Sequence, residues 1–208
     1  MQCSAILLAG GQSSRMGRDK SLLEFEGQPL WRRQLDTLSA LSPQQLMLAG
    51  PARPGCNCEL IADEMPDTGP LGGLAAGLRH CRTPRLVVLA ADLPEISADF
   101  LRSLLAACDH EHGIVPRVAL QTSDAYASKV CKGYYEPLAA VYPASCAALA
   151  AAALREGDFS MQTFVGRAVK RGYLREREIS TRELHLFANL NTPADYEKSR
   201  QRAIHQSR

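Results

Sequence analysis

The chain of 208 residues carries a net charge of +2 and is 46% hydrophobic, 22% charged and 6% aromatic. This composition is typical of a globular domain and excludes a disordered chain, and the near-zero net charge gives no reason to expect nucleic acid as a partner. No apolar run reaches the ~20 residues needed to cross a bilayer, and residues 1–4 lack the charged region ahead of a long apolar stretch that is expected of a signal peptide. We therefore expect a cytoplasmic protein that does not associate with membranes.

Apolar runs and helical stripes alternate along the chain. Residues 5–9 form an unbroken apolar run that ends at Gly10 and Gly11, which is typical of a strand buried on both faces of a parallel sheet. Similar runs predict strands at residues 46–49, 60–62, 85–90 and 137–142. Periodicity and capping signals predict helices at residues 29–41, 71–81, 97–105, 143–155 and 160–170, and a last helix that starts at Thr192.

Strands and helices that alternate at this spacing form right-handed βαβ units. We predict an α/β fold, a Rossmann-like three-layer sandwich in which helices cover both faces of a mostly parallel sheet. Residues 119–135 are polar and show no clear period, so we expect a functional or mobile loop there. No internal repeat or long linker divides the sequence, and residues 1–208 are expected to form one domain.

The cysteines give no sign of a metal site. Seven are present and most are scattered, while Cys56 and Cys58 form a C-x-C pair without a second pair at zinc-ribbon spacing. Because cytosolic chemistry keeps thiols reduced, we expect ordinary reduced or buried cysteines.

The loop that follows the first predicted strand, residues 8–20, is rich in glycine and positive charge. Glycines allow a backbone to approach a phosphate closely and to point amide groups at it. Arg15, Arg18 and Lys20 can neutralise a triphosphate and the charge that develops on its α-phosphorus. The motifs G-x-G-x-x-G and G-x-x-x-x-G-K-[ST] are absent. The alternative is a solvated glycine loop whose basic residues are incidental.

A candidate metal ligand follows the strand predicted at residues 85–90. Asp92 precedes Leu93 and Pro94, which places it at the carboxyl edge of the sheet, where open α/β folds bind their ligands. Mg²⁺ prefers oxygen ligands and usually takes one or two carboxylates together with substrate phosphates. We therefore predict that Asp92 binds Mg²⁺. The alternative is that it shapes the turn before the next helix.

Residues 8–20 read L-A-G-G-Q-S-S-R-M-G-R-D-K and resemble the signature of the molybdenum cofactor guanylyltransferases, within the wider family of sugar-type nucleotidyltransferases. Residues 67–74, 91–94 and 189–193 agree with this family in order and context. The resemblance spans nearly the whole chain and is weakest between residues 119 and 135. It implies transfer of GMP from GTP to the terminal phosphate of molybdopterin-bound molybdenum cofactor, with release of pyrophosphate.

The resemblance also implies roles for individual residues. It places the nucleotide against Leu8, Ala9, Gly10, Gly11, Lys20, Asp63 and Asp92. Lys20, Arg15 and Asp92 would be the catalytic residues, with Asp92 as the Mg²⁺ ligand. Asn189 and Asn191, just before the last predicted helix, could reach a phosphate, a second metal position or the pterin of the acceptor, or could shape the turn before Thr192. Within one domain, residues 1–110 would form the nucleotide-binding part and residues 111–208 the acceptor-binding part. Further partners would be molybdoenzyme apoproteins or their chaperones.

Two positions depart from the family pattern. Glu136 stands where the family often has a neutral polar residue before proline, so the contacts to the pterin remain open. Ala49 stands where some relatives carry a nucleotide-contacting asparagine, and that contact must be lost or replaced here.

Two classes of alternative function remain open at this point. One is a cytidylyltransferase or sugar-phosphate nucleotidyltransferase of the same fold. The paired glycines, Gly10 and Gly11, favour guanine, since cytidine-specific relatives tend to have Ala-Gly there. The other is a non-catalytic nucleotide or cofactor carrier, against which the presence of Lys20 and Asp92 argues.

Overall fold

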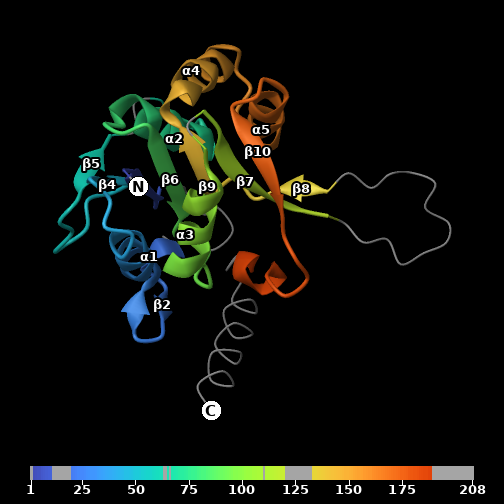
Figure 1. Cartoon of the computed structure of the whole chain (residues 1–208). Helices are drawn as coiled ribbons and strands as arrows, with labels where there is room; N and C mark the ends of the chain where they lie inside the picture. Colours follow the sequence, from blue (N-terminus) through green and yellow to red (C-terminus); the bar gives the residue numbers. More distant parts are fainter. Residues whose placement is uncertain are drawn as a thin grey trace.

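A sheet of eight strands runs through the molecule (Figure 1). The computed structural model describes residues 2–10, 20–62, 65, 67–109, 111–119 and 133–188. The strands of the sheet are β1 (Ser4–Leu8), β4 (Gln45–Ala49), β5 (Glu59–Ile61), β6 (Arg85–Ala90), β7 (Gly113–Val118), β8 (Tyr134–Tyr135), β9 (Ala139–Pro143) and β10 (Leu174–Glu178). Their order is β10-β7-β9-β6-β1-β4-β5, with β8 paired to β7.

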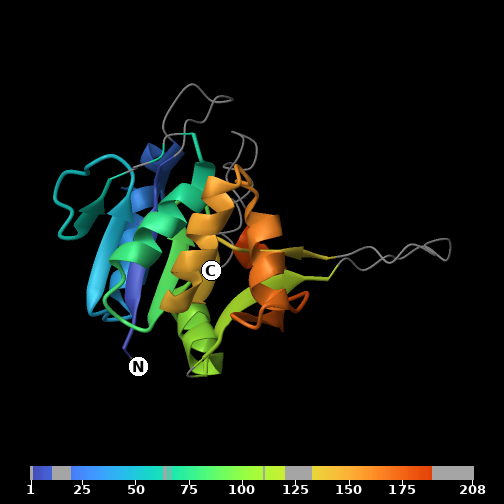
Figure 2. The ribbon, with the colours of Figure 1, turned by 90° about the horizontal axis from the view of Figure 1, so that it is seen from above.

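Helices cover both faces of this sheet. On one face lie α2 (Gly69–His80), α4 (Ala147–Arg155) and α5 (Met161–Lys170), side by side in Figure 2, whose buried side chains share a core cluster with Ile6 of β1. On the other face, α1 (Leu30–Ser39) and α3 (Ala98–Ala107) form a core cluster with Leu7 of β1. Successive residues of a strand point to opposite faces, and Ile6 and Leu7 are both fully buried. The predicted three-layer α/β fold is confirmed.

The register of the central strands brings several strand ends to one edge of the sheet. β1 pairs in parallel with β4 and with β6, so that Leu8 lies opposite both Ala49 and Ala90. β9 runs antiparallel to β6, with Ala139 opposite Leu89. The beginning of β9 therefore lies at the edge where β1, β4 and β6 end.

Several elements differ from the sequence prediction. The edge strand β10 was not predicted, because its sequence L-R-E-R-E buries only Leu174 fully and otherwise resembles a solvated segment. Pro29 is the N-cap of α1 rather than part of its first turn, and it closes a short hairpin of β2 (Glu24–Phe25) and β3 (Gln28–Pro29). Short 3₁₀ helices complete the structure: η1 (Lys20–Leu22), η2 (Ala144–Cys146) and η3 (Leu184–Phe187).

Two expected features fall wholly or largely outside the part of the chain that the structure describes. The helix predicted to start at Thr192 lies beyond residue 188, and most of the loop predicted at residues 119–135 is not described. Within that loop the described residues include β8, so its C-terminal end belongs to the sheet. No helix of the described residues is both long enough and apolar enough to cross a membrane.

One expectation about the cysteines is wrong. Cys56 and Cys58 form a disulfide, with 5.5 Å between their Cα atoms. The C-x-C spacing in the loop between β4 and β5 brings the two thiols within bonding reach. The prediction of reduced thiols had assumed a reducing environment and therefore did not include this disulfide. Cys3, Cys81, Cys108 and Cys146 are free thiols, and three of them are buried.

Candidate functional site

The loops after β1, β4 and β6 meet at the carboxyl edge of the sheet. The amide of Ala9 donates a hydrogen bond of 2.8 Å to the carbonyl of Ala49, and the amide of Ala91 donates one of 3.1 Å to the carbonyl of Leu8. These bonds continue the parallel pairing one residue beyond the strands. They bring three of the predicted nucleotide contacts, Leu8, Ala9 and Gly10, to the edge where Asp92 follows β6.

A close backbone approach joins the first two of these loops. A Cβ atom on Gly50 would lie 2.8 Å from the amide nitrogen of Gly10, and Gly50 has a φ of +144°. Both observations require glycine at this position. This role of Gly50 was not predicted, although the sequence carries a signal for it, a glycine directly after a buried strand. Gly10 itself is exposed, so the backbone facing solvent is open to a ligand.

The N-terminal part of α2 packs against the same strand ends. A Cβ atom on Gly73 would lie 3.1 Å from Cδ2 of Leu8 and 3.5 Å from Cβ of Ala49. The helix begins at Gly69 with a φ of +62°, and Pro70 follows in its first turn. The amide groups of a helix N-terminus favour a nearby anion. This end of α2 therefore adds positive potential near Leu8 and Ala49, where β1 and β4 end.

Asp92 shares a cavity with a second carboxyl group, that of Glu136, which comes from the other side of β6. The amide of Ala90 donates to the carbonyl of Leu138 at 2.8 Å, and the amide of Glu136 donates to the carbonyl of Pro116 at 2.9 Å. Asp92 and Glu136 are both half-buried. Burial, and to a lesser extent the negative charge of Asp92, raise the pKa of the Glu136 carboxyl to about 7.

A cavity of about 400 Å³ lies between these two carboxyl groups and α5. Its walls come from the residues that follow β6, from the first turn of α2, from β8 and the segment that leads into β9, and from the first turn of α5. They are formed by Pro70, Asp92, Leu93, Tyr134, Tyr135, Glu136, Pro137, Leu138, Met161 and Gln162. The mixture of apolar walls and a few polar groups is typical of a small-molecule site.

Hydrogen bonds from α5 and β10 hold the wall of this cavity that β8 forms. The side chain of Gln162 accepts from the amide of Tyr135 at 3.0 Å and donates to its carbonyl at 2.8 Å. The hydroxyl of Tyr135 donates to Glu176 of β10 at 2.6 Å, and burial together with this carboxylate raises the pKa of Tyr135 to about 12. β8 is therefore fixed from both α5 and β10.

Residues 5–171 match the family described as "MobA-like NTP transferase domain". The chain belongs to this family. The MobA-like chain is 33% identical over 202 residues to a probable molybdenum cofactor guanylyltransferase of Opitutus terrae, covering 94% of each sequence. It is 32% identical over 210 residues to a protein of the same name from Natronomonas pharaonis, covering 96% of this chain and 97% of the relative.

Solved structures agree with the fold of the MobA-like chain. Molybdopterin-guanine dinucleotide biosynthesis protein A of Archaeoglobus fulgidus superposes with a TM-score of 0.71 at 23% identity, covering 97% of this chain and 99% of that one. A nucleotidyl transferase of Methanothermobacter superposes with a TM-score of 0.73 at 18% identity, covering 98% of both. The family resemblance inferred from the sequence is confirmed by the family match and by the two relatives.

Several predicted site residues lie outside the described part of the chain. These are Gly11, Arg15, Asp63, Asn189 and Asn191. Lys20 begins η1, but its side chain is likewise not described.

The residue after Lys20 is anchored to the loop between β4 and β5. Ser21 is buried, and its hydroxyl accepts a hydrogen bond of 2.5 Å from Arg53. This contact between the two segments was not predicted from the sequence. It ties the end of the predicted phosphate loop to the segment that follows β4.

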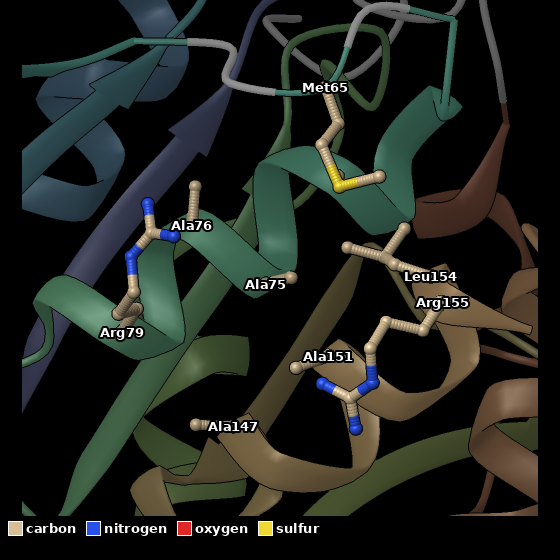
Figure 3. A pocket seen from close by; sticks show the side chains of 9 residues that line it. Met65, Ala75, Ala76, Arg79, Ala147, Ala151, Leu154 and Arg155 are labelled. Atoms are coloured by element: carbon tan, nitrogen blue, oxygen red, sulfur yellow. The ribbon is translucent and has the colours of Figure 1, made fainter.

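A second cavity, of about 410 Å³, lies between α2 and α4 (Figure 3). Small side chains such as Ala75 and Ala151 line it, and Arg79 and Arg155 project from the two helices. Among the described residues, no predicted site residue lines this cavity. We therefore place the candidate site at the cavity beside Asp92.

Proposed function

We propose that this MobA-like NTP transferase transfers GMP from GTP to the terminal phosphate of molybdopterin-type molybdenum cofactor, which yields the guanine dinucleotide cofactor and pyrophosphate. The observation that carries this proposal is the meeting of Leu8, Ala9 and Gly10 with Asp92 at one sheet edge. Relatives over nearly the whole chain bear the name molybdenum cofactor guanylyltransferase, which supports the choice of nucleotide and acceptor. Molybdoenzyme apoproteins or their chaperones would then receive the product.

The nucleotide would occupy the side of the edge formed by β1 and β4. Leu8, Ala9 and Gly10 supply open backbone there, and we assign Gly11 and Asp63 to the same site because they belong to the adjoining segments. Lys20 and Arg15 would neutralise the triphosphate as negative charge develops on the α-phosphorus. Residues 1–110 would therefore form the nucleotide-binding part of a single domain.

The residues at the edge suit a divalent metal ion. Asp92 offers a half-buried carboxylate that lines the cavity, and hard cations such as Mg²⁺ prefer this kind of oxygen ligand. We propose that Asp92 holds Mg²⁺. When bound, the ion would supply positive charge that stabilises the triphosphate.

The transfer itself requires no nucleophile from the protein. A phosphate oxygen of the acceptor attacks the α-phosphorus of GTP, and the bond from that phosphorus to the leaving pyrophosphate breaks in line with the attack. The task of the chain is to hold the two phosphates at reacting distance and to neutralise their charge. The acceptor would be bound by residues 111–208, with Asn189 and Asn191 as further candidates for its contacts.

The test is an incubation of the purified protein with molybdopterin or molybdenum cofactor, Mg²⁺ and each nucleoside triphosphate in turn. We expect GTP to give the guanine dinucleotide cofactor and pyrophosphate, identified by mass spectrometry. Formation of a cytosine dinucleotide from CTP at equal or higher rate would make the protein a cytidylyltransferase. Nucleotide binding without pyrophosphate release would make it a carrier.

A further inference from the structure

The carboxyl group of Glu136 is unusual for its surroundings. It is half-buried, it lines the same cavity as Asp92, and among the described residues no side chain or amide donates a hydrogen bond to it or forms an ion pair with it. A carboxyl group that is withdrawn from water without a donor is unfavourable. The position therefore suits a ligand that brings hydrogen-bond donors.

The position of Glu136 relative to β6 indicates that this ligand is the acceptor and not the nucleotide. β6 separates β1, whose loop carries the predicted phosphate contacts, from β9. Glu136 comes from the β9 side and lines the cavity together with β8 and α5. The nucleotide is proposed to lie on the other side of β6, so this cavity is available to the acceptor.

The remaining walls of the cavity suit a flat heterocycle. Leu93, Leu138 and Met161 provide apolar surface, and Tyr134 is 43% exposed although it lines the cavity. An exposed aromatic ring beside an apolar pocket can stack on a planar ligand. Because Gln162 and Glu176 hold the neighbouring Tyr135, the wall that carries Glu136 is preorganised rather than formed on binding.

We propose that Glu136 recognises the pterin ring of the acceptor, its two carboxylate oxygens accepting hydrogen bonds from the ring N–H and the 2-amino group. These two donors lie side by side on the 2-amino-4-oxopyrimidine edge, a spacing that one carboxylate can match in a bidentate manner. The proposal rests on the proposed function, because it takes the acceptor to be a pterin.

Guanine presents the same pair of donors, so the experiment must separate the two ligands. The probes are pterin and lumazine, two fluorescent pteridines that differ in one group: lumazine has a carbonyl where pterin has the 2-amino donor. We expect the wild-type protein to bind pterin about tenfold more tightly than lumazine. Glu136→Gln presents an amide that can donate to the lumazine carbonyl, and it should abolish or reverse this preference in a fluorescence titration.

A matched control is Glu178→Gln, which removes an exposed carboxylate on β10. It should keep the wild-type ratio of pterin to lumazine affinity. Glu136→Gln nearly preserves the volume of the side chain, and unchanged thermal unfolding will show that its fold is intact. Glu136→Ala provides a second variant that should also lose the preference.

The nucleotide arm compares GTP with ITP, which lacks the 2-amino group of guanine, in the transfer reaction. We expect Glu136→Gln to leave the ratio of kcat/KM for the two nucleotides at the wild-type value. The proposal would be overturned, and Glu136 assigned to the nucleotide base, by a changed ratio of kcat/KM for GTP over ITP together with an unchanged ratio of affinities for pterin over lumazine. Equal binding of the two pteridines by the wild type, or binding of neither, would also overturn it. Because the pteridine titrations need no turnover, their result is independent of a failure of GMP transfer.

Discussion

The backbone of Gly50 lies directly against that of Gly10. A Cβ atom on Gly50 would come within 2.8 Å of the amide nitrogen of Gly10, whereas a Cβ atom on Gly10 would keep an ordinary distance of 3.5 Å from the Cα of Gly50. Gly10 also has no positive φ, unlike Gly50. The two glycines therefore tolerate a methyl group very differently, although both lie at the proposed nucleotide site.

We predict that Gly50→Ala destabilises the protein by about 1–3 kcal/mol, because it forces a strained φ and displaces the loop after β1. Gly10→Ala serves as the matched variant and should change the free energy of unfolding by less than about 0.5 kcal/mol. It should nevertheless weaken GTP binding, since the methyl group occupies the open backbone face. Urea denaturation and a GTP binding isotherm measure the two effects. Equal stability loss in both variants would contradict the close approach seen here.

We predict that Asp92→Asn lowers the rate of GMP transfer by about a hundredfold or more, because it removes the carboxylate proposed to hold the metal ion. Thermal unfolding should change little, since Asp92 is only half-buried at the end of β6. Binding of Mn²⁺, followed by electron paramagnetic resonance, should weaken in parallel with activity. Asp99→Asn is the control, because that side chain is 89% exposed. Wild-type turnover of Asp92→Asn at saturating Mg²⁺ would refute the assignment.

We predict that Lys20→Ala lowers kcat more than it weakens GTP binding, because its charge matters most as negative charge builds up on the phosphates. Steady-state kinetics and a separate binding isotherm distinguish the two effects. Lys170→Ala removes an exposed lysine from the last turn of α5 and should change neither. If only the dissociation constant of Lys20→Ala rose, Lys20 would bind the nucleotide without acting in the transition state.

The strands that position the site differ in how readily the sequence predicts them. β1 was predictable because all five of its residues are buried, as expected of a strand covered on both faces. β10 was not, because it lies at the end of the sheet order and carries four charged residues. Burial on both faces leaves a pattern in the sequence, and an edge strand with one buried residue does not.

The same contrast applies to the candidate site. Asp92 was predictable because a buried strand ends just before it, so that chain geometry alone placed it at the sheet edge. That Asp92 shares a cavity with Glu136 was not predictable, because this depends on the antiparallel pairing of β9 with β6. The close approach of Gly50 likewise depends on the register of β4 with β1. Pairing direction and register are tertiary properties, which one strand considered alone does not encode.

The last prediction concerns the pH dependence of stability and rests on Asp109, which lies after α3. The side chain of His112 and the amides of His112 and Glu111 hydrogen-bond its carboxylate, and Arg175 forms an ion pair with it. These contacts, the side chain of His112 first, hold the pKa of Asp109 well below its usual range. Its carboxylate therefore stabilises the folded state above the unfolded pKa of about 3.9, and this contribution is lost as the pH falls toward the lower folded value.

Asp109→Asn should accordingly lower the urea midpoint at neutral pH, and the difference from the wild type should narrow as the pH falls below about 4. The sign follows from proton uptake: the unfolded chain binds a proton at Asp109 at a pH where the folded chain does not, so acid removes this particular contribution only from the protein that has this carboxylate. Asp99→Asn, which removes an exposed carboxylate on α3, should show a smaller difference across the same range. A difference between Asp109→Asn and the wild type that stays constant down to about pH 2 would show that the contacts of Asp109 do not depend on its charge.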